Sequence, residues 1–335
     1  MSHFKLEIVL NSRNQKLSLI VGMLGIVFLF GYNKLSAHQL YIDLTHPTPT
    51  FEPLDGDMNK PDFSKPHGDS DPRGIPSFGP QTVYQIGDKF YTNEGYFYAG
   101  RFATSEHHGT HIDASVHYIN NEETLEGEFP TRKYVHEMTV SDLVGPVVLV
   151  DISGRVASEL DKNDGLPSPD TNITDFSNSS ANVVTASDIE MVEGEIRDGS
   201  WIVINTGWSK FYYESDWAKS PYMNGFNYPG LNKEAVDKII EIEDKKKIRI
   251  NGIVADNIGI DSGESSSPGK DYKFHNAFYS HVRGMQRGWK FVENANYLSQ
   301  LLQAKPNSCL IIVGAPNHIM GSGGPARIMA ICDPK

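Results

Sequence analysis

The sequence predicts an α/β fold in one domain, built on a mixed β-sheet with flanking helices, and three observations support it. Short apolar runs rich in β-branched residues recur along the chain between Gly, Pro, Asn or Asp, as buried strands do. Amphipathic stretches with helix-capping residues lie between some of them. The 335 residues suffice for one large core, and the chain has neither an internal repeat nor a Gly-rich nucleotide-binding loop.

The individual elements follow from these patterns. Strands are predicted at residues 40–44, 147–152, 201–205, 248–255, 289–292, 309–313 and 326–331. Helices are predicted at residues 186–193, 232–245, 274–286 and 295–302, with Ser187 and Asn232 as N-caps of the first two. Residues 158–181 are polar and read as a surface insertion, and residues 51–80 as a long loop.

Composition and charge narrow the class of partner. Hydrophobic residues make up 39% and charged residues 21% of the chain, as in ordinary soluble globular proteins. The formal net charge of −12 disfavours binding to nucleic acid or to an anionic membrane surface. We therefore expect a small-molecule substrate and no nucleic-acid partner.

The N-terminal segment has the character of a targeting sequence. Lys5, Arg13 and Lys16 precede an uncharged apolar run at residues 17–30. This run is short for a membrane span, which needs about 20 residues, and it suits the core of a signal peptide. We expect a signal peptide at residues 1–37, a domain at residues 38–335, and a secreted or secretory-lumen protein. The alternative is a retained anchor at residues 17–32, which would make the membrane a partner.

Two further features bear on the secretory route. Asn172 and Asn178 begin glycosylation triplets in the polar stretch, where they would be exposed. Cys309 and Cys332 flank the last two apolar runs. They could pair in an oxidising compartment or remain buried thiols, and the sequence leaves both options open.

The segment HHGTHID, residues 107–113, carries the clearest chemistry. Imidazole and carboxylate donors without thiolate suit Zn²⁺ or Mn²⁺. His111 and Asp113 are two apart, so on a strand both face the same side. His107 would lie about 13 Å from His111 in a straight strand, so the chain must bend, and Gly109 permits the bend. We predict that His107, His111 and Asp113 hold a divalent metal; the alternative is a coincidental histidine cluster on a surface loop.

Three more residues are candidates for catalysis. His117 shares the parity of the predicted ligands and is interpreted as a proton carrier rather than a fourth ligand, whereas His108 is expected to point away. His281, on a predicted helix, and Glu293, at the end of the next strand, are expected to meet. They would hold water, substrate or a second ion, or form an ordinary hydrogen bond. His275 is a nearby rival for His281.

The metal segment resembles a known motif. Residues 107–118 are similar to H-x-G-T-H-x-D-x-P-x-H-F of the cyclase family, which includes bacterial kynurenine formamidases and isatin hydrolases. The matching residues are His107, Gly109, Thr110, His111, Asp113 and His117. Ser115 and Tyr118 replace the Pro and Phe of the motif. These two changes affect backbone and packing rather than the predicted ligands.

The resemblance extends through most of residues 40–332. Residues 43–47 and 204–208 resemble the opening strand and the central strand of the family, and residues 321–327 resemble the isatin hydrolase form of its C-terminal turn. Asp256 and Asp261 match two family aspartates, and the pair His281 and Glu293 matches residues that the formamidases use at a second metal. The resemblance implies a swivelling β/β/α fold, one or two Mn²⁺ or Zn²⁺ ions, and a homodimer.

The functional hypothesis is a metal-dependent amidohydrolase acting on carbon–nitrogen bonds other than peptide bonds. Metal-activated water would cleave a small amide or cyclic amide, such as an aryl formamide or an isatin-like compound, with catalytic help from His117, His281 and Glu293. Aromatic residues before the metal segment either wall an aromatic-substrate pocket or pack in a core. They are Phe90, Tyr91, Tyr96, Phe97, Tyr98 and Phe102.

Three alternatives remain at this point. The same metal site could catalyse a dehydration or a ring closure. The chain could be a secreted glycoprotein that binds a metal or ligand without catalysis, although a proton carrier beyond the ligands is more typical of an enzyme. It could also be a membrane-anchored structural glycoprotein, which would leave the histidine cluster unexplained.

Overall fold

A computed structural model describes residues 39–66, 82–85, 89–92, 95–118, 132–213, 221–263 and 278–335. The chain divides into two units, Met1–Gln39 and Leu40–Lys335, and the account below concerns the second. The predicted signal peptide or anchor and His275 lie outside the described residues. Among the residues described, no helix is both long and apolar enough to cross a membrane.

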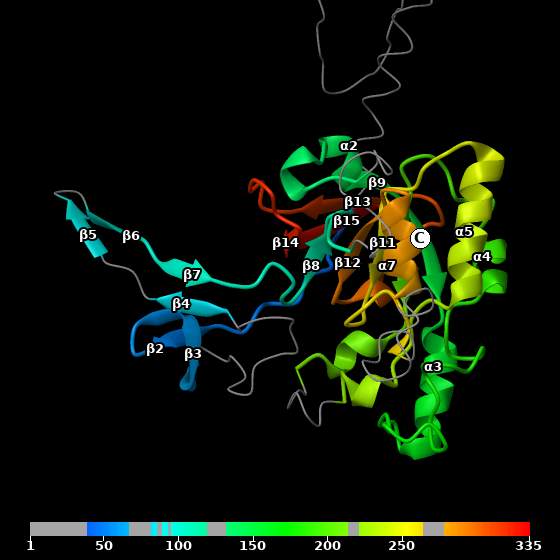
Figure 1. The fold of residues 1–335 in the computed structure, drawn as a ribbon, viewed down its shortest axis with the longest axis horizontal. Helices are drawn as coiled ribbons and strands as arrows, with labels where there is room; N and C mark the ends of the chain where they lie inside the picture. The colour runs from blue at the N-terminus through cyan, green and yellow to red at the C-terminus, as the bar shows by residue number, and fades with distance from the viewer. Residues whose placement is uncertain are drawn as a thin grey trace, which may run out of the picture. The chain divides into compact units, whose positions relative to one another are not determined.

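The central feature is a nine-stranded mixed sheet (Figure 1). Its strand order is β1-β15-β13-β9-β10-β11-β12-β8-β14. The bounds are β1 Leu40–Asp43, β8 His111–Asp113, β9 Val144–Asp151, β10 Trp201–Asn205, β11 Gly252–Ala255, β12 Lys290–Glu293, β13 Leu310–Gly314, β14 Gly323–Pro325 and β15 Arg327–Cys332. The four strands β9 to β12 pair in parallel, and the strands on either side of them pair antiparallel.

The parallel strands are apolar because both of their faces are covered. All five residues of β10 are buried, and alternate residues point into two different cores. Ile202 and Ile204 belong to the core beneath the helices, whereas Trp201 and Val203 belong to the core that β1, β13 and β15 close. One face of the parallel strands therefore packs against helices and is called the helix side below. The other face packs in the core that includes residues of β1, β13 and β15.

Helices of 6 to 14 residues cover the helix side. They are α3 Ser153–Leu160, α4 Ala186–Met191, α5 Lys233–Lys246 and α7 Tyr279–Gln286, with α2 Val140–Leu143 before β9. Figure 1 shows α4 beside α5, and the residues Ile239 of α5 and Met285 of α7 belong to the same core. Asn232 caps α5 by accepting a hydrogen bond from the Ala235 amide, and the apolar face of α5 contributes Val236 and Ile239 to the core.

Smaller elements complete the described chain. A four-stranded sheet has the order β3-β2-β4-β7, and β5 pairs with β6. These strands are β2 Phe51–Leu54, β3 Asp57–Pro66, β4 Val83–Gln85, β5 Lys89–Thr92, β6 Gly95–Tyr98 and β7 Arg101–Ala103. The 3₁₀ helices are η1 Val135–Glu137, η2 Asp161–Asn163, η3 Trp208–Phe211, η4 Asn224–Phe226 and η5 Leu298–Gln303.

The predicted fold class is confirmed, and each of the seven predicted strands appears in the large sheet. Some local predictions were wrong. The helix at residues 186–193 is capped by Thr185 with Asp188 rather than by Ser187, residues 295–302 form only the 3₁₀ helix η5, and residues 51–80 include β2 and β3. The polar stretch 158–181 is anchored by Phe176, which is fully buried in the core beneath the helices.

Cys309 and Cys332 form a disulfide that joins the start of β13 to the end of β15, 23 residues apart in the sequence. Closing a loop of this length stabilises a fold by about 3 kcal/mol in the chain-entropy account. We expect the double variant Cys309→Ala/Cys332→Ala to unfold with a free energy lower by about that amount, measured by urea titration. Dithiothreitol should lower the melting temperature of the wild type and leave that of the variant unchanged; an unaffected wild type would contradict the prediction.

Candidate metal centre

Strand pairing brings the two halves of the site together. β8 lies between β12 and β14 and is antiparallel to both. In this register His111 stands directly opposite Glu293, so their side chains leave the sheet on the same face. Ile112, between the two predicted ligands of β8, points into the opposite core. The alternation predicted from sequence is therefore present, with His111 and Asp113 on the helix side.

A left-handed turn at Gly109 brings the His107 side chain next to Asp113. Gly109 has φ +64°, a conformation that glycine adopts at little cost, and a Cβ there would lie 3.0 Å from Thr48 Oγ1. The bend lets His107 Nδ1 lie 2.6 Å from Asp113 Oδ1. This is the bend that the sequence requires if both residues are to hold one ion.

Asp113 is the centre of the arrangement. Two groups of side chains have ligand atoms within 4.8 Å of one another: His107, Asp113 and His117, and His111, Asp113 and Glu293. His111 Nε2 lies 3.3 Å from Asp113 Oδ1 and 3.5 Å from Glu293 Oε2. His281 Nε2 lies 3.4 Å from Glu293 Oε1 and 3.8 Å from Asp113 Oδ2. The predicted ligands and the predicted catalytic residues thus form one cluster.

Three of these histidines are oriented in the same way. His111 Nδ1 lies 2.9 Å from the Gly109 carbonyl oxygen, to which it must donate, and its Nε2 faces the carboxylates. His281 Nδ1 lies 2.6 Å from Asp261 Oδ2, and its Nε2 faces Glu293. His107 Nε2 lies 3.0 Å from Ser322 Oγ, and its Nδ1 faces Asp113. Each ring has one nitrogen bonded outward and the other directed at Asp113 or Glu293, as metal-binding histidines do.

The cluster favours positive charge. Burial opposes protonation of His111, but the Asp113 and Glu293 carboxylates outweigh it and raise its pKa to about 9. Burial likewise opposes protonation of His281, and hydrogen bonds to Asp261 and Glu293 raise its pKa to about 10. Burial would raise the pKa of Asp113, but the neighbouring histidines hold it well below its usual range. A bound cation would meet the same demand for positive charge.

The residues present fit a divalent metal. Asp113 is 1% exposed, and its Oδ2 is buried with no hydrogen-bond partner among the described residues. A buried carboxylate oxygen without a partner is costly, so it points to a missing cation. The donors are imidazole nitrogens and carboxylate oxygens, a set that suits Zn²⁺ and Mn²⁺ alike.

His117 and His108 have different surroundings. The His117 ring lies 3.8 Å from that of His107 and 6.2 Å from that of His281, between centroids. Burial lowers the pKa of His117 to about 4. His117 is thus as close to the cluster as the predicted ligands, and its role as a proton carrier stays a prediction. His108 is 1% exposed, and burial lowers its pKa to about 4.

Sequence reasoning gave no role in orienting the histidines to Asp261, which it noted only as matching a family aspartate, or to Asn294. Asp261 accepts from the backbone amide of Ser280 at 2.6 Å as well as from His281, so it fixes the start of α7 and the ring together. Asn294 Nδ2 donates to the Gly109 carbonyl at 2.9 Å, the same oxygen that orients His111. Adjacency to Glu293 is the one sequence signal that could have singled out Asn294.

The His107 ring packs against Gly323, where any side chain would collide with it. A Cβ at Gly323 would lie 2.4 Å from His107 Cε1 and 2.6 Å from the Ile112 carbonyl oxygen. We expect Gly323→Ala to displace the ring and weaken metal binding at least about 10-fold, as disturbed support of a ligand does. Affinity would be measured by competition with a chelator. Gly154→Ala, where a Cβ meets nothing within 4 Å, is the control; equal affinities for the two variants would contradict the prediction.

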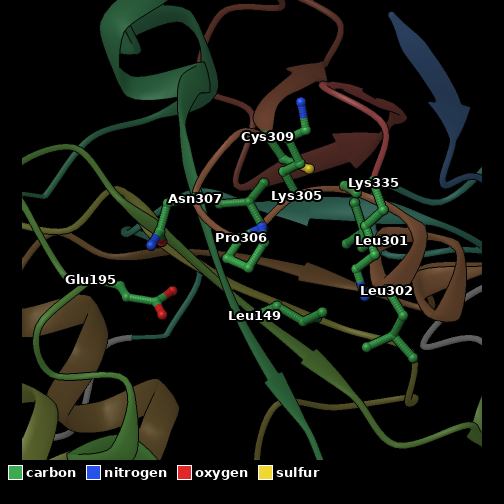
Figure 2. A pocket seen from close by; sticks show the side chains of 11 residues that line it. Leu149, Glu195, Leu301, Leu302, Lys305, Pro306, Asn307, Cys309 and Lys335 are labelled. Carbon is green, nitrogen blue, oxygen red and sulfur yellow. The ribbon is translucent and has the colours of Figure 1, made fainter.

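A separate pocket of about 190 Å³ lies against β9 and η5 (Figure 2). Its lining includes the apolar side chains of Leu149, Leu301 and Leu302 and the charged residues Glu195 and Lys305. None of the predicted site residues lines it. The aromatic residues predicted to wall a substrate pocket belong to β5, β6 and β7; Phe102 is 71% exposed, and the other side chains lie outside the description.

Comparison with known proteins gives a consistent result. The Cyclase family profile matches residues 42–262. Isatin hydrolase of Roseibium aggregatum is 26% identical over 245 residues, which cover 72% of this chain and 78% of that protein. A crystal structure of an isatin hydrolase bound to the product analogue thioisatinate has a TM-score of 0.61 at 20% identity, covering 94% of this chain and all of that one. Isatin hydrolase A from Labrenzia aggregata, bound to benzyl benzoate, has a TM-score of 0.60 at 21% identity, covering 92% and 99%.

Proposed function

The chain belongs to the cyclase family of metal-dependent hydrolases, and we propose that it hydrolyses the carbon–nitrogen bond of a small cyclic amide of the isatin type. One observation carries the proposal: His107, His111 and His281 each direct one nitrogen at the buried carboxylates of Asp113 and Glu293. Such convergence of histidines and carboxylates is typical of a hydrolytic metal site. The 26% identity to an isatin hydrolase favours a cyclic amide over an open-chain formamide.

We assign His107, His111 and Asp113 as ligands of one divalent ion, Mn²⁺ or Zn²⁺. When bound there, the ion would lower the pKa of a water molecule and polarise the scissile carbonyl. Glu293 stands opposite His111 and beside His281. We assign to the pair Glu293 and His281 the role of holding the attacking water and the substrate, or a second ion.

The chain's own groups account for proton movement and orientation. We assign to His117, whose ring lies 3.8 Å from that of His107 between centroids, the role of taking a proton from water and passing it to the leaving nitrogen. Asp261 keeps His281 in one orientation through its 2.6 Å hydrogen bond. The near-complete burial of Asp113 and Glu293 limits bulk water around the reacting groups, which strengthens their electrostatic effect.

The direct test is a hydrolysis screen with protein reconstituted in Mn²⁺ or Zn²⁺. The substrates are isatin, N-formylkynurenine, simple lactams and cyclic imides, and the measured product is the carboxylate. We expect turnover of the five-membered cyclic amide to exceed that of the open-chain formamide. Faster turnover of N-formylkynurenine than of the cyclic amide would change the proposed substrate class to open-chain formamides. It would leave the proposed metal-dependent hydrolysis unchanged. Metal binding without turnover of any of them would overturn the hydrolase proposal.

We also propose a secretory route and a homodimeric state for this enzyme. The disulfide between Cys309 and Cys332 supports an oxidising compartment, and Asn172 and Asn178 are exposed. Expression of the full chain in a secretory host, followed by N-terminal sequencing and glycosidase treatment, tests cleavage after residue 37 and use of both triplets. An N-terminus at residue 1 in a membrane fraction would favour the anchor instead. Sedimentation of the purified protein tests the dimer.

A further inference from the structure

The turn between β13 and β14 contributes one side chain, Ser322, that contacts His107, and a second, His318, that contacts the neighbouring Glu106. Ser322 Oγ is 3.0 Å from His107 Nε2 and donates to Glu106 Oε2 at 2.6 Å. The backbone amide of Ser322 donates to the same Glu106 oxygen at 3.1 Å. On its other side, Glu106 Oε1 lies 2.6 Å from His318 Nε2. The Glu106 carboxylate is therefore held at both oxygens, and its place relative to Ser322 is fixed.

The direction of these hydrogen bonds determines the state of the His107 ring. A hydroxyl group has one hydrogen to donate, and a carboxylate can only accept. Because Ser322 gives its hydrogen to Glu106, its oxygen must accept from the N–H at His107 Nε2. The lone pair that a metal needs is then left at Nδ1, the atom 2.6 Å from Asp113. Ser322 and Glu106 thus select the tautomer in which His107 can bind an ion beside Asp113.

Close packing keeps the turn in this place. A Cβ at Gly321 would lie 2.1 Å from His318 Nε2, and one at Gly323 would lie 2.4 Å from His107 Cε1. The backbone on either side of Ser322 therefore touches both rings. The outward partners of the other two oriented histidines are direct acceptors, a carbonyl for His111 and a carboxylate for His281. At His107 the Glu106 carboxylate acts through the Ser322 hydroxyl rather than by a direct hydrogen bond to the ring.

We propose that Ser322 and Glu106 are positioning residues that set the orientation and tautomer of His107 for metal binding. This rests on the proposed function only in taking His107 as a metal ligand. It adds two residues that touch neither substrate nor ion, and it explains why a Ser between two glycines stands at this turn. Their effect should appear in metal affinity before it appears in protein stability.

The test compares four purified full-length variants for affinity to Mn²⁺ and Zn²⁺ by chelator competition. Ser322→Ala and Glu106→Ala should each weaken affinity by about 10- to 100-fold, the usual cost of losing such a partner. Glu106→Gln keeps an oxygen that can accept from Ser322, so it should stay within about threefold of the wild type. Ser308→Ala is the matched control, since its hydroxyl donates to the Lys305 carbonyl and contacts none of the cluster.

A second readout separates positioning from folding. The melting temperature of the metal-free Ser322→Ala and Glu106→Ala proteins should stay within a few degrees of the wild type. Should Ser322→Ala fail to fold, Glu106→Ala decides, because the Glu106 side chain is 37% exposed. Affinities within twofold of the wild type for both alanine variants, or a Gln variant as weak as Glu106→Ala, would overturn the positioning role. A wild-type protein without affinity for either ion would overturn both the positioning role and the proposed function. Metal affinity without hydrolysis would overturn only the proposed function.

Discussion

Replacing Asp113 by Ala is expected to remove the metal and lower kcat/KM by at least about 1,000-fold, a loss of about 4 kcal/mol in transition-state stabilisation. Asp113 belongs to both groups of potential ligands, and its Oδ1 lies 2.6 Å from His107 Nδ1 and 3.3 Å from His111 Nε2. Without it the two histidines lose the carboxylate they share. Metal content would be measured by elemental analysis after dialysis, and kcat/KM with the best substrate of the screen.

Two further variants sharpen this experiment. Asp113→Asn keeps the shape of the side chain, so it separates the loss of the ligand charge from the effect of a cavity. Asp161→Ala removes an exposed aspartate on η2 and should match the wild type in metal content and rate. An Asp113→Ala protein that stays active after metal removal would exclude the proposed chemistry.

Replacing Glu293 by Gln should lower kcat/KM by about 100- to 1,000-fold, within the range usual for groups that handle protons at an active site. The Glu293 side chain is 4% exposed and lies within 3.5 Å of both His111 Nε2 and His281 Nε2. Gln fills the same space but carries no charge, so the cluster loses one of its two central carboxylates. Steady-state kinetics measures the loss.

The metal content of Glu293→Gln separates the two roles proposed for this residue. A fall of one ion per chain would assign Glu293 to a second metal, and an unchanged count would assign it to water or substrate. Glu159→Gln is the control, because Glu159, on α3, is also buried but accepts hydrogen bonds from Lys162 and from the backbone amide of Asp175. Activity within about fivefold of the wild type would remove Glu293 from the mechanism.

Much of this fold can be predicted from local patterns in the sequence. β10 was predicted at its observed bounds because a fully buried parallel strand is apolar at every position and ends at polar Asn205 and Thr206. α5 was predicted within one residue because Asn232 is a good cap and the apolar spacing is regular. By contrast, β8 has only three residues, and its place between β12 and β14 depends on pairings across about 180 and 210 positions that no local pattern encodes.

The same distinction holds at the metal centre. The spacing of His107, His111 and Asp113, with Gly109 between, was enough to predict the bend and the shared face, because both are local geometry. The contact of Glu293 with His111 was not anticipated, since it follows from strand register. Asp261, Ser322 and Glu106 were not assigned roles in orienting the histidines, because each acts through a hydrogen bond to a residue distant in sequence or hidden behind another side chain.

The position of β8 also bears on when the protein can acquire its metal. During synthesis, the segment that contains His107 and Asp113 is complete long before β12 and β14 exist. Until those strands are made, His111 has no Glu293 opposite it and His107 has no Ser322 to orient its ring. Tight metal binding should therefore begin only near the end of folding, and the ion would then stabilise the finished chain by mass action. Metal uptake during refolding would accordingly report completion of the sheet rather than collapse of the chain.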